Sequence, residues 1–176
     1  NIGSRKSYVA SNFGYPVFNA DHEVSKLYKQ NRKIFKKLNK KLPKYISSFP
    51  IDKNEITKAI LSNKVNLKKI IAIVHYEIRR ALKLFLKKNR NKKIIILDIP
   101  LLLENKINHQ KDILVFVDSN KKDIEKRLKK RPNFNQKLIN KFKKIQFSSS
   151  YKKKKSNFII KNNFKKKALK RSIKII

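Results

Sequence analysis

The sequence of 176 residues contains no cysteine, which excludes both disulfide bonds and thiolate metal sites. It has no run of 18 apolar residues, so we expect no transmembrane helix, and no basic segment followed by an apolar stretch, so we expect no signal peptide. These absences fit a protein of the reducing cytoplasm, which is the location that we predict. The apolar share of 40% is typical of a folded chain, and the length suits one domain with a core.

Acidic residues are also scarce. Lysine and arginine together number 48 against 11 aspartates and glutamates, so the formal net charge is +37. A nucleic acid or an anionic membrane surface would suit such a charge. Of the 48 cations, however, 40 are lysine, whereas nucleic-acid interfaces favour arginine, and the lysines are spread along the whole chain. We therefore attribute most of the charge to composition and solvated faces and predict neither a nucleic acid nor a membrane as partner.

Short apolar runs alternate with segments of helical period. The continuous apolar runs at 92–100 and 112–119 predict buried strands of a parallel sheet, and two further strands are predicted at 15–20 and 157–163. Helices are predicted at 7–13, 21–42, 52–61, 66–88, 120–131, 135–146 and 165–176. Asp52 and Glu55 have the spacing of a capping box at the start of one of them. Strands separated by helices indicate an α/β fold.

Polar residues stand where the predicted strands end. Asp21 follows the first strand, Asp98 ends the second, and Asn162 follows the last. The turn Gly3–Ser7 precedes a helix. Ligands of parallel sheets bind beyond the carboxyl ends of the strands, so we expect these residues at one edge of the sheet.

The opening residues, NIGSRKS, contain part of a phosphate-binding loop. Gly3, one of only two glycines in the chain, would let successive backbone N–H groups point into one nest. Lys6 would then reach the β- and γ-phosphates of a nucleotide, and the hydroxyl of Ser7 would bind Mg²⁺. The leading glycine of the pattern would lie one residue before Asn1. A plain N-terminal turn is the alternative interpretation.

Each of the other candidates also has a structural alternative. Asp21 could accept a proton from a substrate hydroxyl, or it could cap a helix. His75, with Arg79 one turn later, could bind a phosphate-bearing substrate, or it could be a partly buried helix histidine. Asp98 could hold the water shell of Mg²⁺, or it could cap a strand end. With three dispersed histidines and no cysteine, a zinc site is not expected.

A basic segment runs from Lys129 through Lys130 and Arg131 to Lys144. It could close as a lid over the phosphates of ATP. The alternative is a lysine-rich face that is simply solvated.

In their order along the chain, these segments resemble the dephospho-CoA kinase family, P-loop kinases of coenzyme A biosynthesis. The family has a GGIGSGKST-type loop, an IDAD segment, a long helix with HP, the strands LDIPLLFE and VLVVD, a lid helix ending in Gln, and the segment ADxVIxN. This chain reads NIGSRKSY, FNAD, VHYEI, LDIPLLLE, ILVFVD, KFKKIQ and SNFIIKNN in the same order. The most specific piece is LDIPLLLE at 97–104, and the resemblance covers essentially the whole chain.

The resemblance implies that ATP phosphorylates the 3′-hydroxyl of dephospho-CoA with the help of Mg²⁺, and we expect a monomer. It implies a fold like that of nucleoside-monophosphate kinases, a parallel sheet flanked by helices, in which the first central strand would lie before Asn1. A single kinase domain is expected over 1–176, with a helical substrate-binding region at about 22–90 and a lid at about 129–147.

The resemblance also implies roles for single residues. Lys6 and Asp21 are the implied catalytic residues, with Asp21 as the base. Ser7 is expected to bind the metal ion together with Asp98, whose role was inferred from its position at the end of a strand. His75 and Arg79 are expected to bind dephospho-CoA. The expected ATP site consists of Asn1, Ile2, Gly3, Ser4, Arg5, Lys6, Ser7, Tyr8 and, near the adenine, Asn162.

The chain departs from the family pattern at several positions. Arg5 replaces the last loop glycine, Tyr8 a threonine, Asn19 the first aspartate of the DAD segment, and Tyr76 the proline of HP. Phe142 falls where the lid often carries an arginine. If position 5 needs a positive φ, arginine is strained there by roughly 1–2 kcal/mol. These departures leave two alternatives open: a degenerate family member that no longer catalyses, and a basic nucleic-acid-binding protein.

Overall fold

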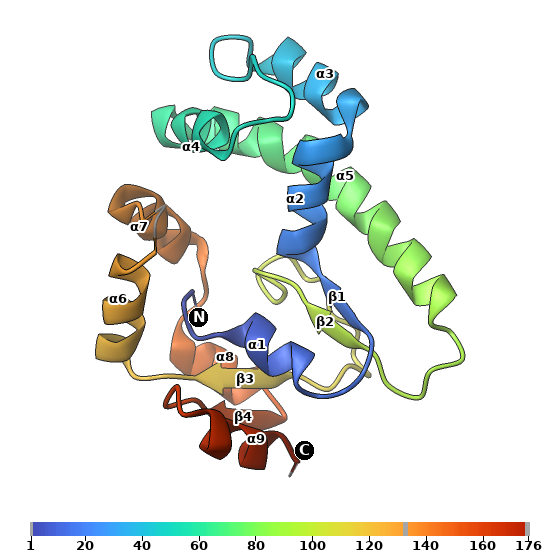
Figure 1. Ribbon diagram of the computed structural model, residues 1–176, viewed down its shortest axis with the longest axis vertical. Helices are drawn as coiled ribbons and strands as arrows, with labels where there is room; N and C mark the ends of the chain where they lie inside the picture. The colour runs from blue at the N-terminus through green and yellow to red at the C-terminus, as the bar shows by residue number, and fades with distance from the viewer. Residues whose placement is uncertain (1, 132–133, 175–176) are drawn as a thin grey trace. The chain divides into compact units, whose positions relative to one another are not determined.

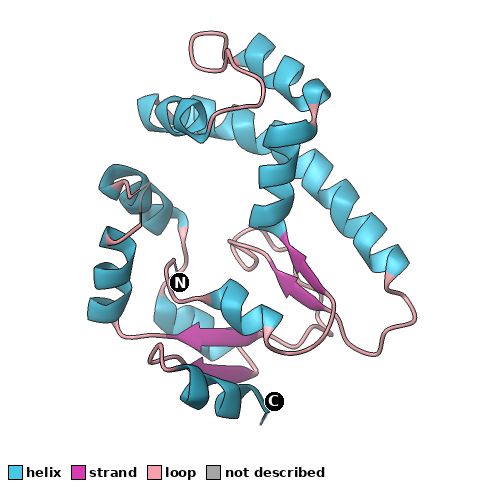
Figure 2. Ribbon diagram, in the orientation of Figure 1, coloured by secondary structure: helices cyan, strands magenta, loops and turns pink. Residues whose placement is uncertain are grey.

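The computed structural model describes residues 2–131 and 134–174 as an α/β fold (Figures 1 and 2). The chain forms two compact units, one made of Asn1–Val17 with Ile96–Ile176 and the other of Phe18–Ile95. The described strands form two short sheets, in which β1 (Val17–Asn19) pairs with β2 (Ile96–Asp98) and β3 (Val115–Asp118) pairs with β4 (Phe158–Lys161). All four strands lie within the predicted runs and are shorter than predicted.

The first unit is built around the parallel pair β3–β4, in which Val117 is the register partner of Ile160. Val9 packs on this pair from α1, and Leu169 and Ile173 pack on it from α9, so that one apolar cluster joins both helices to the sheet. Figure 1 shows α1 beside β3 and α9 beside β4. The helices of this unit are α1 (Lys6–Ser11), α6 (Lys121–Lys129), α7 (Gln136–Ile145), α8 (Ser149–Lys155) and α9 (Lys166–Lys174).

Helix α8 covers the opposite face of β3. Because side chains alternate between the two faces of a strand, Phe116 and Asp118 point to this face. Phe116 is 5% exposed, and the Lys153 ammonium of α8 lies 5.9 Å from the centre of its ring. Lys153 also forms an ion pair of 2.7 Å with Asp118. The sequence analysis missed α8, since its SSYKKKK segment has no apolar period. The helix begins at a Ser148 cap and is held by ion pairs with distant residues.

The second unit is helical. Its long helix α5 (Lys64–Lys88) contacts α2 (Ala20–Gln30), α3 (Arg32–Lys41) and α4 (Lys53–Ser62). The expectation of one continuous helix over 21–42 is wrong, because Asn31 ends α2 and begins α3. Its φ of −98° and ψ of 92° are extended, and its side chain accepts a hydrogen bond of 3.0 Å from Ile34 N. Asparagine is a preferred helix cap, so Asn31 indicated a break between two helices. The apolar period continues across Asn31 and favoured one continuous helix instead.

The expected capping box at the start of α4 is half right. Asp52 caps the helix and accepts a hydrogen bond of 2.9 Å from Asn54 N. The Glu55 Oε1 atom accepts hydrogen bonds from Ser47 N and Oγ and from Ser48 N. Glu55 therefore fixes the preceding loop, and these hydrogen bonds outweigh burial and lower the pKa of its carboxyl group.

Candidate functional site: a phosphate loop at the start of the chain

Gly3 is required in the opening loop for two independent reasons. Its φ is +85°, in the region that glycine adopts without strain. A Cβ atom at this position would lie 2.9 Å from Ile124 Cγ2 and 3.2 Å from Leu128 Cγ, both on α6. This position therefore favours glycine, because a side chain here would press on Ile124 and Leu128 of α6.

Arg5 adopts a left-handed conformation, with φ of 62° and ψ of 33°, immediately before α1. Its carbonyl oxygen accepts the first hydrogen bond of the helix from Val9 N at 3.0 Å. Position 5 thus needs a positive φ, and an arginine adopts it at a cost of roughly 1–2 kcal/mol.

Two buried polar residues hold the loop against the end of the sheet. Ser4 is 0% exposed and Asn162, which directly follows β4, is 3% exposed. Asn162 Nδ2 donates to Ser4 O at 2.9 Å, and Asn162 Oδ1 accepts from Phe164 N at 2.9 Å. The Asn162 backbone N–H donates to Asp118 O at 2.7 Å. Asn162 therefore ties the loop to the carboxyl ends of both strands, and its expected contact with adenine stays a prediction.

Arg127 of α6 is a site residue that the sequence analysis missed. Its Nη1 donates to Gly3 O at 2.9 Å. Burial lowers the pKa of its guanidinium group, and the neighbouring charges of Arg5 and Arg131 lower it further. Arginine is the exception in this lysine-rich chain, with 8 against 40 lysines, but only the fold brings Arg5, Arg127 and Arg131 near one another.

Lys6 and Ser7 are the first two residues of α1; Lys6 is half-buried and Ser7 is exposed. Helix α1 contacts β2, the strand that ends at Asp98, and Asp98 is 8% exposed. The structure thus brings the element that carries the loop hydroxyl beside the strand that carries the acid. A hydroxyl and a carboxylate are hard oxygen donors of the kind that Mg²⁺ prefers, together with water and substrate phosphates. Asn1 lies outside the described residues, and Ile2 is half-buried in the loop.

Asp21, His75 and Arg79 belong to the second unit and are described within it. Asp21 is the second residue of α2 and is exposed. The cap of this helix is Asn19, which accepts a hydrogen bond of 2.8 Å from His22 N, so the interpretation of Asp21 as the cap is wrong. His75 and Arg79 lie one turn apart on α5. Burial, followed by the charge of Arg79, lowers the pKa of His75, which favours a neutral imidazole at pH 7.

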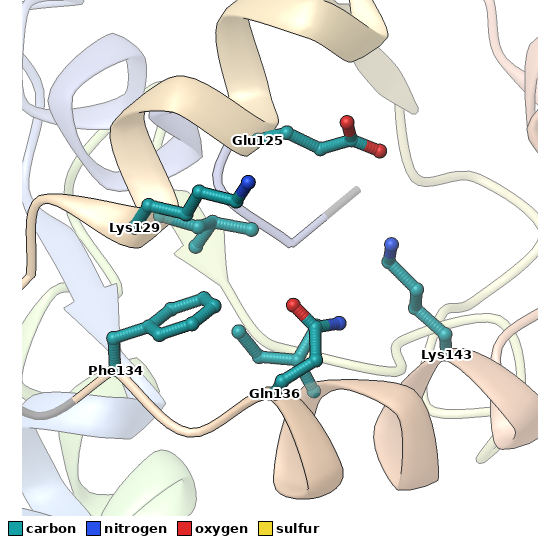
Figure 3. A pocket seen from close by; sticks show the side chains of 7 residues that line it. Glu125, Lys129, Phe134, Gln136 and Lys143 are labelled. Carbon is teal, nitrogen blue, oxygen red and sulfur yellow. The ribbon is translucent and has the colours of Figure 1, made fainter.

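A cavity of about 240 Å³ lies between α6 and α7 in the first unit, where the sequence predicts a lid. Phe134 lies on one wall, and Leu128 and Ile139 add apolar surface. Figure 3 shows the side chains of Lys129 and Lys143 directed into this space from the two helices. Of the described helices, none is long and apolar enough to cross a membrane.

These features define a class of protein. A loop with a positive-φ glycine and a buried Ser4 precedes a helix that begins with Lys6 and Ser7, and it is anchored at the carboxyl ends of a parallel strand pair. This is the arrangement of a P-loop nucleotide kinase.

The family follows from comparison with known proteins. The family model for dephospho-CoA kinase matches residues 1–167, and the chain belongs to the dephospho-CoA kinase family. Dephospho-CoA kinase from Wolbachia pipientis is 35% identical over 164 residues, which cover 90% of this chain and 84% of that protein. Dephospho-CoA kinase from the Wolbachia of Brugia malayi is 30% identical over 164 residues, which again cover 90% of this chain and 84% of that protein.

Solved structures show the same fold. A Thermus thermophilus crystal structure matches with a TM-score of 0.76 at 24% identity, over 99% of this chain and 91% of that one. Dephospho-CoA kinase from Campylobacter jejuni matches with a TM-score of 0.57 at 21% identity, over 96% and 86%. Family membership assigns to this chain the ATP-dependent phosphorylation of dephospho-CoA to coenzyme A.

Proposed function

We propose that the turn Gly3–Ser7 binds the β- and γ-phosphates of ATP, from which the γ-phosphoryl group passes to the 3′-hydroxyl of dephospho-CoA. The observation that carries this proposal is the anchoring of the loop by two side chains. Asn162 binds Ser4 O from the sheet, and Arg127 binds Gly3 O from α6. These two hydrogen bonds fix the turn, and a fixed turn of this kind suits phosphate binding by its backbone N–H groups. The proposed ATP contacts are made by Asn1 to Tyr8 and, near the adenine, by Asn162.

Lys6 is proposed to neutralise charge on the transferring phosphoryl group. Mg²⁺, held by Ser7 and Asp98 together with water and phosphate oxygens, would supply further positive charge there. Catalysis of phosphoryl transfer depends mostly on positioning and charge stabilisation. A loop held by two side-chain hydrogen bonds, with a half-buried lysine, suits both requirements.

Asp21 is proposed to accept the proton of the 3′-hydroxyl. Its carboxylate is exposed in the first turn of α2, directly after β1, and so is accessible to an acceptor substrate. His75 and Arg79 are proposed to bind dephospho-CoA. The exposed Arg79 guanidinium suits a phosphate group, and a neutral His75 offers one donor and one acceptor.

The region from the end of α6 through α7, about 129–147, is proposed to act as a lid over ATP, and residues of about 22–90 are proposed to form the acceptor side. A lid that excludes water during transfer would direct the phosphoryl group to the acceptor hydroxyl. Lys129 and Lys143, which line the cavity between these helices together with the carboxylate of Glu125, are proposed to provide cations for the phosphate chain.

The experiment that tests the proposal is an assay of purified protein with ATP, Mg²⁺ and dephospho-CoA, in which coenzyme A and ADP are measured together. The strained backbone at Arg5 favours one alternative, a degenerate member, which predicts substrate binding without turnover. The other alternative, a nucleic-acid-binding protein, predicts tight DNA or RNA binding that persists at about 150 mM salt.

A further inference from the structure

The two departures from the loop pattern, Arg5 and Tyr8, lie against each other. The Arg5 guanidinium carbon is 4.8 Å from the centre of the Tyr8 ring. Tyr8 is itself half-buried and packs against the cluster of Val9, Val117 and Ile160. A guanidinium group that stacks on an anchored ring has fewer conformations than a free surface side chain. The ring therefore holds the Arg5 cation at the phosphate loop.

This cation belongs to a group of three arginines, Arg5, Arg127 and Arg131. Arg127 lies close enough to Arg5 and Arg131 for their charges to lower its pKa, after burial. In residues 2–131 and 134–174, no carboxylate forms an ion pair with any of these three arginines. Two acids of the same unit are paired with lysines instead, Glu104 with Lys152 and Asp118 with Lys153. Three neighbouring cations, none of them in an ion pair with a described carboxylate, suit a ligand that carries several negative charges.

The left-handed backbone conformation of Arg5 also supports a functional role for this residue. Non-glycine residues in this conformation are strained, and such strain concentrates at functional sites. Helix α7 provides four lysines and no arginine, so Arg5 and Arg127 are the planar, bidentate donors next to the loop.

We propose that Arg5 is a phosphate-binding residue of this kinase, held in place by Tyr8, and that it binds the phosphate chain of ATP together with Arg127. The proposal rests on the proposed function of the loop. If Arg5 binds phosphate, its presence in place of the family's glycine is compatible with an active loop.

The test compares ATP binding by calorimetry, with and without Mg²⁺, in the unchanged protein and in Arg5→Gly and Arg5→Asn. Both variants remove the cation but tolerate a positive φ. We expect each to weaken ATP binding about tenfold or more, since a charge-assisted hydrogen bond is lost. Arg5→Gly should at the same time raise the thermal midpoint by about 3 °C, because the backbone strain is relieved. ATP binding by Arg5→Gly that equals or exceeds that of the unchanged protein would overturn the proposal.

Lys106→Gly is the matched control. Lys106 is also a cation at positive φ, 49°, but it is exposed in the loop after β2. Its replacement removes the same charge and the same kind of strain, and it should leave ATP affinity within about twofold. If both glycine variants weaken binding equally, net charge explains the effect and the specific role of Arg5 is wrong.

The role of Tyr8 is tested by non-additivity. Tyr8→Thr should weaken ATP binding about threefold, Tyr8→Phe should not, and Tyr8→Thr should add nothing to Arg5→Gly. An equal effect of Tyr8→Thr in both backgrounds would contradict the pairing.

The same binding data separate this proposal from the proposed function. If the unchanged protein binds ATP but forms no coenzyme A, the proposed phosphorylation of dephospho-CoA is refuted. The ATP affinities of the variants still decide the role of Arg5 in that case. If the unchanged protein does not bind ATP, both proposals fail.

Discussion

Asn162 and Ser4 are 158 positions apart in the sequence and are joined by a buried hydrogen bond of 2.9 Å from Asn162 Nδ2 to Ser4 O. The Asn162→Asp variant keeps the acceptor for Phe164 N but turns the donor into an oxygen that faces Ser4 O. We expect a loss of about 2–3 kcal/mol in the free energy of unfolding and weaker ATP binding. Urea denaturation and ATP titration measure both.

Asn163→Asp is the control for this variant. Asn163 is exposed, and its side chain accepts a hydrogen bond from Lys165 N that an aspartate can also accept. It should therefore behave like the unchanged protein. An Asn162→Asp variant of unchanged stability would show that this hydrogen bond does not hold the loop.

The two glycines provide a matched pair for the packing of the loop. Both have positive φ, 85° at Gly3 and 78° at Gly14, but only at Gly3 would a Cβ atom meet neighbours within 4 Å. Gly14→Ala should cost about 1 kcal/mol of stability from backbone strain alone. Gly3→Ala should cost about 1–3 kcal/mol more, because the methyl group presses on Ile124 and Leu128 of α6. Equal costs in denaturant unfolding would show that the close approach to α6 is not required.

Glu104, the last residue of LDIPLLLE, is held by two donors. Its Oε1 accepts from Phe147 N at 2.9 Å and pairs with Lys152 at 2.6 Å, with 8% of the Glu104 side chain exposed. Burial raises the pKa of the Glu104 carboxyl group, but these partners outweigh burial and lower it overall. Its stabilisation is therefore present above the unfolded pKa of about 4.5 and is lost as pH falls through the lower folded value.

Glu104→Gln tests this ion pair. We expect a loss of about 3 kcal/mol at pH 7, because Lys152, whose side chain is only 12% exposed, is left without its partner. We also expect a weaker fall of stability below pH 4.5. Glu23→Gln, in an exposed pair with Lys26, should cost less than about 0.5 kcal/mol. A Glu104→Gln variant with the acid sensitivity of the unchanged protein would contradict this assignment.

Asp21→Asn tests the proposed base. The amide keeps the size of the side chain but cannot accept the proton, so kcat should fall by at least about a hundredfold with thermal stability unchanged. Glu23→Gln, two residues later on α2, should retain full activity. Steady-state kinetics with dephospho-CoA as the varied substrate measure both variants. A rate near that of the unchanged protein in Asp21→Asn would refute the role.

Local patterns predicted much of this fold. The four strands follow short apolar runs, and α5 follows a broad apolar stripe, because burial of apolar side chains decides both. What the sequence did not reveal depends on tertiary contacts. Helix α8 has no apolar period and is held by Lys152 and Lys153, whose acidic partners are far away in the sequence.

The placement of the candidate site residues in the fold was predictable to a similar degree. The loop and the residues at strand ends were identified because glycine, lysine and acids have positional meaning in an α/β sheet. Arg127 was missed because its contact with Gly3 spans 124 positions and no local motif marks it. The sequence alone could not show whether position 5 has a positive φ, since the conformation of a loop depends on the residues that pack around it.

The most direct test of the account is the formation of coenzyme A by the purified protein from ATP, Mg²⁺ and dephospho-CoA, followed by mass spectrometry. The account predicts one coenzyme A for each ADP, with the new phosphate on the 3′-hydroxyl, and no turnover in Lys6→Ala. ATP binding with no coenzyme A formed, or equal turnover in Lys6→Ala, would contradict it.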